Sequence, residues 1–264
     1  MKKRIGGIEM AWDDTGQGLP LVLLHAFPVN RRMWAAEREA LAPRYRVITP
    51  DFRGHGESGL AEEDSTMERL AEDVCGLLDE LKLERVALGG LSMGGYAAFA
   101  FLGRYADRVG ALILADTRAG ADSEDGRKAR HDSAALAEKE GAGVIAERLL
   151  PKLLGATTQA NKPEVVAAVR AMILSTPPAG IARALRGMAA RSDSTPLLGA
   201  IRVPTLILVG EEDTLTPPAE SEAMAKAIPG AALVKIPAAG HLANLEQPAA
   251  FTRALEDFLG SLRF

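Results

Sequence analysis

Short apolar runs alternate along this chain with longer stretches whose apolar residues recur at helical spacing. The runs occupy residues 21–24, 47–49, 85–88, 109–115, 203–209 and 232–236. Runs of this length without polar alternation are typical of strands that are buried on both faces of a sheet. Together with a hairpin expected around Ile8, Met10 and Trp12, they predict an α/β fold: a mostly parallel eight-stranded sheet flanked by helices.

The alternation stops between Arg118 and Ser194, where no run with strand character occurs. Four helical stretches bounded by Gly or Pro follow one another instead, at residues 126–140, 144–154, 163–175 and 178–191. We expect residues 118–194 to form a helical cap (lid) over the carboxyl edge of the sheet, and residues 1–117 and 195–264 to form the core domain. The alternative is that the four stretches are ordinary crossover helices.

The composition and charge indicate which kinds of partner and which cellular location to expect. The 264 residues carry a net charge of −4 at neutral pH, so we expect no basic face and no nucleic-acid partner. The apolar runs are far shorter than the roughly 20 residues of a spanning helix, and the basic residues 2–4 lead into no apolar signal segment, so we expect no membrane contact. The single cysteine, Cys75, excludes an internal disulfide, which favours a cytoplasmic location. The oligomeric state is left open.

The sequence Gly90-Leu91-Ser92-Met93-Gly94 matches the pattern G-x-S-x-G. The pattern alone is weak, but here a predicted strand leads directly into it and an apolar helical stretch follows it. In that context the serine stands on a sharp turn that exposes its hydroxyl as a nucleophile. The alternative is a glycine-rich turn that carries a solvated serine.

A serine hydroxyl needs a base within hydrogen-bond reach, and the base needs a carboxylate that fixes its tautomer. Among the four histidines, His241 follows the last predicted strand and is the best candidate base. Asp213 follows the strand before it and is the best candidate acid, which gives the chain order Ser92, Asp213, His241. Asp116 also ends a strand and is the rival acid, whereas Glu211 and Glu212 are expected to be solvated.

Acyl transfer also needs two N–H donors where the oxyanion forms. The backbone N–H of Met93, directly after the serine, is expected to supply one of them. The backbone N–H of Phe27, in the loop after residues 21–24, is expected to supply the other.

These motifs carry a resemblance to a known family. They are His25-Ala26-Phe27-Pro28, Asp51-Phe52-Arg53-Gly54-His55-Gly56-Glu57-Ser58, residues 90–95, Gly210-Glu211-Glu212-Asp213 and Gly240-His241. In this order they resemble the α/β-hydrolase superfamily, and within it cap-bearing serine hydrolases similar to 3-oxoadipate enol-lactonases, carboxylesterases and cofactor-free haloperoxidases. One departure is Ala26, where the family usually has glycine.

The resemblance implies a serine hydrolase that cleaves a small carboxylic ester or lactone through an acyl-enzyme on Ser92. It implies that Ser92, Asp213 and His241 form the triad, with Phe27 and Met93 at the oxyanion hole. Two alternatives remain open: a perhydrolase that uses the same triad with peroxide, and a ligand receptor without catalysis on the same scaffold.

Two further features of the sequence bear on cofactor and metal binding. Residues 54–59 match G-x-G-x-x-G, but an acidic loop follows them instead of a helix, so we expect no dinucleotide there. The scattered histidines and the single cysteine predict no metal site and, with no phosphate-binding loop, no cofactor.

The substrate pocket is expected between the sheet edge and the helical insertion. Its candidate lining residues are His25, Trp34 and Arg118, together with apolar positions at Phe27, Met93, Leu136, Ile145, Leu149, Met172, Leu185 and Met188. Arg118 follows a strand end, where it either pairs with a carboxylate of an enol-lactone-like substrate or is a solvated surface arginine.

Overall fold

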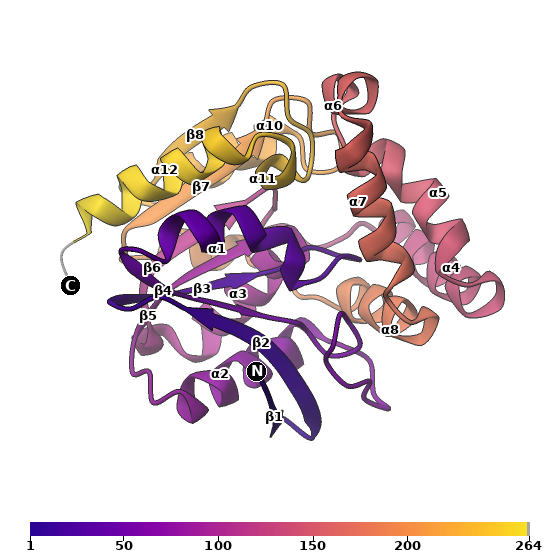
Figure 1. Ribbon diagram of the computed structural model, residues 1–264, viewed down its shortest axis with the longest axis horizontal. Coiled ribbons are helices and arrows are strands. Elements are labelled where there is room, and N and C mark those ends of the chain that lie inside the picture. The colour runs from indigo at the N-terminus through magenta and orange to yellow at the C-terminus, as the bar shows by residue number, and fades with distance from the viewer. Residues whose placement is uncertain (263–264) are drawn as a thin grey trace.

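The computed structural model describes residues 1–262 and contains one eight-stranded sheet with helices on both faces (Figure 1). The strands are β1 (Lys2–Ile5), β2 (Ile8–Thr15), β3 (Leu19–Leu24), β4 (Tyr45–Pro50), β5 (Val86–Leu91), β6 (Val109–Ala115), β7 (Thr205–Gly210) and β8 (Ala232–Ile236). Their spatial order is β1-β2-β4-β3-β5-β6-β7-β8. β1, β2 and β4 pair antiparallel and the remaining pairs are parallel, which confirms the predicted α/β architecture and its opening hairpin.

The central strands are buried on both sides, as their unbroken apolar runs predict. In β3, Leu21 and Leu23 point into one apolar cluster, while Val22 and Leu24 point into another on the opposite face. Helices α1 (Ala35–Leu41), α11 (Ala243–Glu246) and α12 (Pro248–Ser261) cover the first face. Helices α2 (Met67–Glu80), α3 (Met93–Arg104) and α10 (Pro218–Ala227) cover the second.

Of the helices between β6 and β7, the first five gather at one end of the sheet (Figure 1). They are α4 (Glu124–Glu140), α5 (Ala142–Leu153), α6 (Ala156–Asn161), α7 (Pro163–Leu174) and α8 (Pro178–Ala189). We call these five helices the helical layer. Four of them match predicted stretches, whereas α6, of only six residues, was not predicted.

Short elements complete the chain. They are η1 (Arg31–Trp34), η2 (Ala106–Arg108) and α9 (Thr195–Leu198).

Within residues 1–262, no single helix is long and apolar enough to cross a membrane. Only α7 and α8 taken together reach that length and composition, and they are bent by 92°.

Candidate active site

Ser92 stands on the sharp turn between β5 and α3. Its φ of +56° lies in a region that non-glycine residues rarely adopt, so the surrounding structure must enforce this geometry. The flanking glycine is required by close packing: a Cβ added at Gly90 would lie 2.2 Å from the carbonyl carbon of Gly94. The predicted turn is therefore present, and the serine is its strained residue.

His241 and Ser92 are brought together from 149 residues apart. Nε2 of His241 lies 2.8 Å from the hydroxyl oxygen of Ser92. On the other side of the ring, Nδ1 lies 2.8 Å from Oδ2 of Asp213. The three side chains chosen from the sequence thus form one hydrogen-bonded chain, and all three are buried.

Asp213 is held as a carboxylate by several donors. The backbone N–H groups of Leu215 and Thr216 donate to its Oδ1 at 2.8 and 3.0 Å, and the Thr216 hydroxyl donates to its Oδ2 at 2.6 Å. Burial by itself would raise the pKa of Asp213, but His241 and these hydrogen bonds outweigh burial and lower it. Thr216, which sequence reasoning missed, also lies 3.3 Å from Nδ1 of His241.

Asp116, the rival acid, is buried beside this chain without joining it. Its Oδ1 accepts the backbone N–H of Gly210 at 2.8 Å, and its Oδ2 has no partner among the described residues. Burial and the nearby charge of Asp213 raise the pKa of Asp116 well above its ordinary value. Burial and the neighbouring carboxylate therefore disfavour the charged form of Asp116, which is the form that a histidine partner needs.

His25 lies beneath the loop that carries Phe27. The backbone N–H of Phe52 donates to its Nε2 at 2.9 Å, so Nδ1 carries the proton and donates to the carbonyl of Ala26 at 2.8 Å. Burial lowers the pKa of His25 to about 4, which keeps the ring neutral. The ring therefore supports the loop and does not face a substrate.

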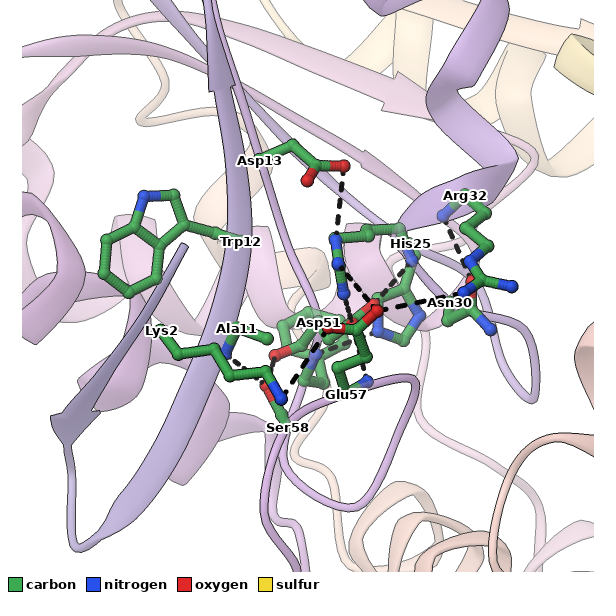
Figure 2. A network of polar contacts seen from close by, with 12 residues as sticks. Lys2, Ala11, Trp12, Asp13, His25, Asn30, Arg32, Asp51, Glu57 and Ser58 are labelled. Carbon is green, nitrogen blue, oxygen red and sulfur yellow. Dashed lines mark hydrogen bonds and ion pairs between the residues drawn. The ribbon is translucent and has the colours of Figure 1, made fainter.

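Asp51 supports the chain that follows the same loop (Figure 2). Its Oδ1 accepts the backbone N–H of Arg31 at 2.8 Å, and its Oδ2 accepts the Arg31 guanidinium and the backbone N–H of Glu57. Ser58 donates its hydroxyl to the backbone carbonyl of Asp51 at 2.7 Å. The sequence 51–58, read as a family landmark, thus forms a buried polar network behind the site.

A cavity of about 290 Å³ opens onto Ser92 and His241. The sheet end contributes Phe27, Ser92, Tyr96, Arg118, Leu215, Thr216 and His241, and the helical side contributes Asp122, Gly126, Ala129, Arg130, Ser133, Leu149, Leu153, Leu185 and Met188. Larger hollows, of about 300, 410, 600 and 630 Å³, contain none of the residues of the hydrogen-bonded chain. We therefore take the smaller cavity as the candidate substrate site.

Several expected lining residues are placed elsewhere. Arg118, Phe27, Leu149, Leu185 and Met188 do line the cavity. His25 and Trp34 do not line it: His25 is buried under the Phe27 loop, and Trp34 packs against Phe251 of α12. The other expected apolar positions that do not line it are Met93, Leu136, Ile145 and Met172.

Arg118 belongs to an unusual charge cluster in the cavity wall. Three guanidinium groups, those of Arg118, Arg130 and Arg191, surround the single buried carboxylate of Asp122. Burial by itself would raise the pKa of Asp122, but Arg130 and Arg191 outweigh burial and hold it far below its ordinary value. Sequence reasoning missed Asp122, in the loop before α4, and Arg130, within α4, since no local pattern distinguishes them from surface residues.

Two further expectations can be compared with the structure. Glu212 is not fully solvated: it is half-buried, and its side chain accepts from Thr157 in α6, so that prediction is wrong. Among residues 1–262, no three His, Cys, Asp or Glu side chains are grouped so that they could hold a metal ion.

A family model for the alpha/beta hydrolase fold matches residues 20–248. The chain belongs to the α/β-hydrolase fold family. The resemblance predicted from the motifs is thereby confirmed.

Proteins similar to this α/β hydrolase include enol-lactonases and an esterase. A 3-oxoadipate enol-lactonase of Acinetobacter baylyi is 32% identical over 244 residues, which cover 92% of this chain and 89% of the relative. A thermophilic esterase of Thermogutta terrifontis, solved with malate bound, is 49% identical with a TM-score of 0.97 and 98% coverage of both chains. An enol-lactonase of Burkholderia xenovorans is 33% identical with a TM-score of 0.92, covering 99% of this chain and 100% of that one.

Proposed function

We propose that this α/β hydrolase cleaves a small carboxylic ester or lactone through an acyl-enzyme on Ser92. The observation that carries the proposal is the hydrogen-bonded chain from Asp213 through His241 to the Ser92 hydroxyl. Nε2 of His241 takes the serine proton as Oγ attacks the substrate carbonyl, and then delivers it to the leaving alkoxide. Water activated by the same nitrogen releases the acid.

The oxyanion of each tetrahedral intermediate needs donors placed before the reaction begins. We assign this role to the backbone N–H groups of Phe27 and Met93. Met93 is the first residue of α3, where a backbone N–H has no partner within the helix, and Phe27 lines the cavity beside Ser92.

We further propose that residues 118–194 act as the cap of the site, and that residues 1–117 and 195–264 form the core domain. The last two residues of that range, Arg263 and Phe264, lie outside the described residues. Support comes from the cavity wall, since α4, α5 and α8 supply most of the side that faces Ser92.

The cluster around Asp122 favours an ester or lactone that also carries a carboxylate. Three guanidinium groups against one carboxylate leave the wall with excess positive charge, and Arg118 and Arg130 both line the cavity. A planar guanidinium matches the geometry of a carboxylate. Arg118 would then bind the substrate, as its place after β6 suggested.

Labelling with a fluorophosphonate, followed by mass-spectrometric mapping of the modified peptide, tests the mechanism. We expect stoichiometric modification of Ser92, because only an activated serine attacks this reagent at an appreciable rate. An unlabelled protein, or a label on another residue, would contradict the acyl-enzyme proposal and favour the ligand-receptor alternative.

The perhydrolase alternative uses the same three side chains. Peroxide added to an ester assay separates it from hydrolysis: a hydrolase continues to release free acid, whereas a perhydrolase turns to peracid as its main product.

A further inference from the structure

The helical layer and the sheet end meet at a seam directly beside His241. Gly155 precedes α6, and Gly240 precedes the histidine. A Cβ added at Gly240 would lie 2.3 Å from the backbone nitrogen of Gly155, and one added at Gly155 would lie 2.8 Å from that of Gly240. The two backbones are therefore in direct contact, with no room for a side chain between them.

A single buried carboxylate joins the two sides of this seam. Glu246, in α11, is fully buried, and its Oε1 accepts the backbone N–H of Gly240 at 2.9 Å. Its Oε2 accepts the backbone N–H of Gly155 at 2.8 Å. Beside it, the backbone N–H of Leu242 donates to the carbonyl of Leu153 at 3.1 Å. Both residues that flank His241 are thus tied to the segment between α5 and α6.

The acid loop is tied to the start of α6, directly after this segment. Oε2 of Glu212, the residue before Asp213, accepts the backbone N–H of Thr157 at 2.9 Å, and its Oε1 accepts the Thr157 hydroxyl. The loops that carry the base and the acid therefore contact one short piece of the helical layer.

We infer that Glu246 is a positioning residue. By binding both Gly240 and Gly155, it fixes the position of His241 relative to Ser92 and the position of the helical wall of the cavity. This inference rests on the proposed function. Leu149 and Leu153, near the end of α5, line the cavity, so a shift at Gly155 displaces the wall and the histidine loop together. Glu246 does not touch the cavity itself, since it is not among the residues that line it.

The chemistry of the seam requires a carboxylate at this position. Each oxygen of Glu246 receives one backbone N–H, and a carboxylate offers acceptors on both sides. Glutamine has the same shape but offers one acceptor, and its NH2 group would face the second N–H. The seam must then open on one side, either at Gly155 or at Gly240.

The test compares Glu246→Gln with the wild-type protein in two assays. One measures kcat and KM for p-nitrophenyl acetate, and the other measures the rate at which a small fluorophosphonate labels Ser92. We expect both kcat and the labelling rate to fall roughly tenfold or more at the pH of maximal activity, because small misplacements of a base are costly. A merely structural role would change the melting temperature and leave the labelling rate of the folded protein unaltered.

Gly155→Ala provides a second variant, which disturbs the seam and keeps the charge of Glu246. We expect a similar fall in both rates, and a double variant that is less than additive, because both changes act on one contact. Glu211→Gln is the matched control, since Glu211 is an exposed carboxylate of the acid loop. It should keep both rates within about twofold.

Wild-type labelling rates in both seam variants would overturn the inference. A changed pH profile of Glu246→Gln with an unaltered maximal rate would also overturn it, because Glu246 would then act on His241 through charge alone. Should Glu246→Gln fail to fold, Gly155→Ala decides the question. A wild-type protein that is not labelled at all would contradict the proposed function instead.

Discussion

The sheet end and the helical layer contribute to the same cavity in different ways. The sheet end supplies the groups proposed to react, and it holds them by backbone geometry: the strained turn at Ser92 and the loops after β7 and β8. The helical layer supplies side chains from helix faces, namely an apolar wall and Arg130, the α4 partner of Asp122. The comparison suggests that reaction type depends on the sheet end and that substrate choice depends on the helical layer.

Removal of the nucleophile tests the sheet end most severely. We expect Ser92→Ala to lower kcat for p-nitrophenyl acetate by roughly 10³-fold or more, because the remaining groups can only stabilise the attack of water. A small side chain also fits the tight turn, so circular dichroism and the melting temperature should be nearly unchanged. Undiminished hydrolysis by purified Ser92→Ala would remove this serine from the mechanism.

The two carboxyl groups at neighbouring strand ends provide the next test. We expect Asp213→Asn to lower kcat by roughly 10³- to 10⁴-fold, because His241 then loses the partner that fixes its tautomer. Asp116→Asn should cost less than about tenfold, since Asp116 accepts the backbone N–H of Gly210, whereas Asp213 is the partner of His241. Steady-state kinetics on the pair decides between them, and the reverse ranking would make Asp116 the acid.

The Asp122 cluster, which joins Arg118 of the sheet end to Arg130 of the helical layer, should affect selectivity more than chemistry. We expect Arg118→Gln to lower kcat/KM for a mono-p-nitrophenyl ester of a dicarboxylic acid by about 10- to 100-fold, the value of one charge-assisted hydrogen bond. The neutral p-nitrophenyl acetate should change less than about threefold. Arg170→Gln is the matched control, because Arg170 pairs with Glu147 on the exposed surface of the same layer. Equal losses on both esters would separate Arg118 from substrate recognition.

At the sheet end, the sequence predicted which side chains lie together, because backbone rules apply there. A glycine-flanked serine between a strand and a helix has few structural solutions, and parallel strands bring Asp213 and His241 to the same edge. Thr216 was missed because a threonine three residues after an aspartate is common, and only the fold brings its hydroxyl 3.3 Å from His241.

In the helical layer, the sequence predicted four of the five helices but not which of their apolar residues line the cavity. Helical periodicity states which residues are apolar, but it does not state which of two buried faces meets the cavity. Leu149 lines the cavity, whereas Ile145, one turn earlier on the same helix, packs into the core of the layer. Trp34 was expected in the pocket and packs instead against Phe251 of α12, because the local sequence pattern does not determine which helix covers it.

The last prediction extends the comparison to buried carboxyl groups. Asp122 in the helical side is surrounded by arginines, whereas Glu37 in α1 is buried with one amide, Nδ2 of Asn244, at 3.5 Å. Burial raises the pKa of Glu37 from its ordinary 4.5 to about 8, despite the hydrogen bonds that oppose it. The native state therefore keeps a proton on Glu37 that the unfolded chain releases above about pH 4.5.

The sign of the effect follows from this proton. Between pH 4.5 and 8 the native state binds more protons than the unfolded state, so Glu37 makes the free energy of unfolding fall as pH rises, by up to about 1.4 kcal/mol per pH unit. Urea unfolding at pH 5.5, 6.3 and 7.0 measures the slope, and Glu37→Gln should remove the part that belongs to this group while leaving kcat unchanged. Asp122→Asn should lower the free energy of unfolding without altering the slope, because Asp122 stays ionised in both states across this range. An unchanged slope in Glu37→Gln would mean that the native protein already accommodates the Glu37 charge, and the contrast between the two carboxyl groups would then be lost.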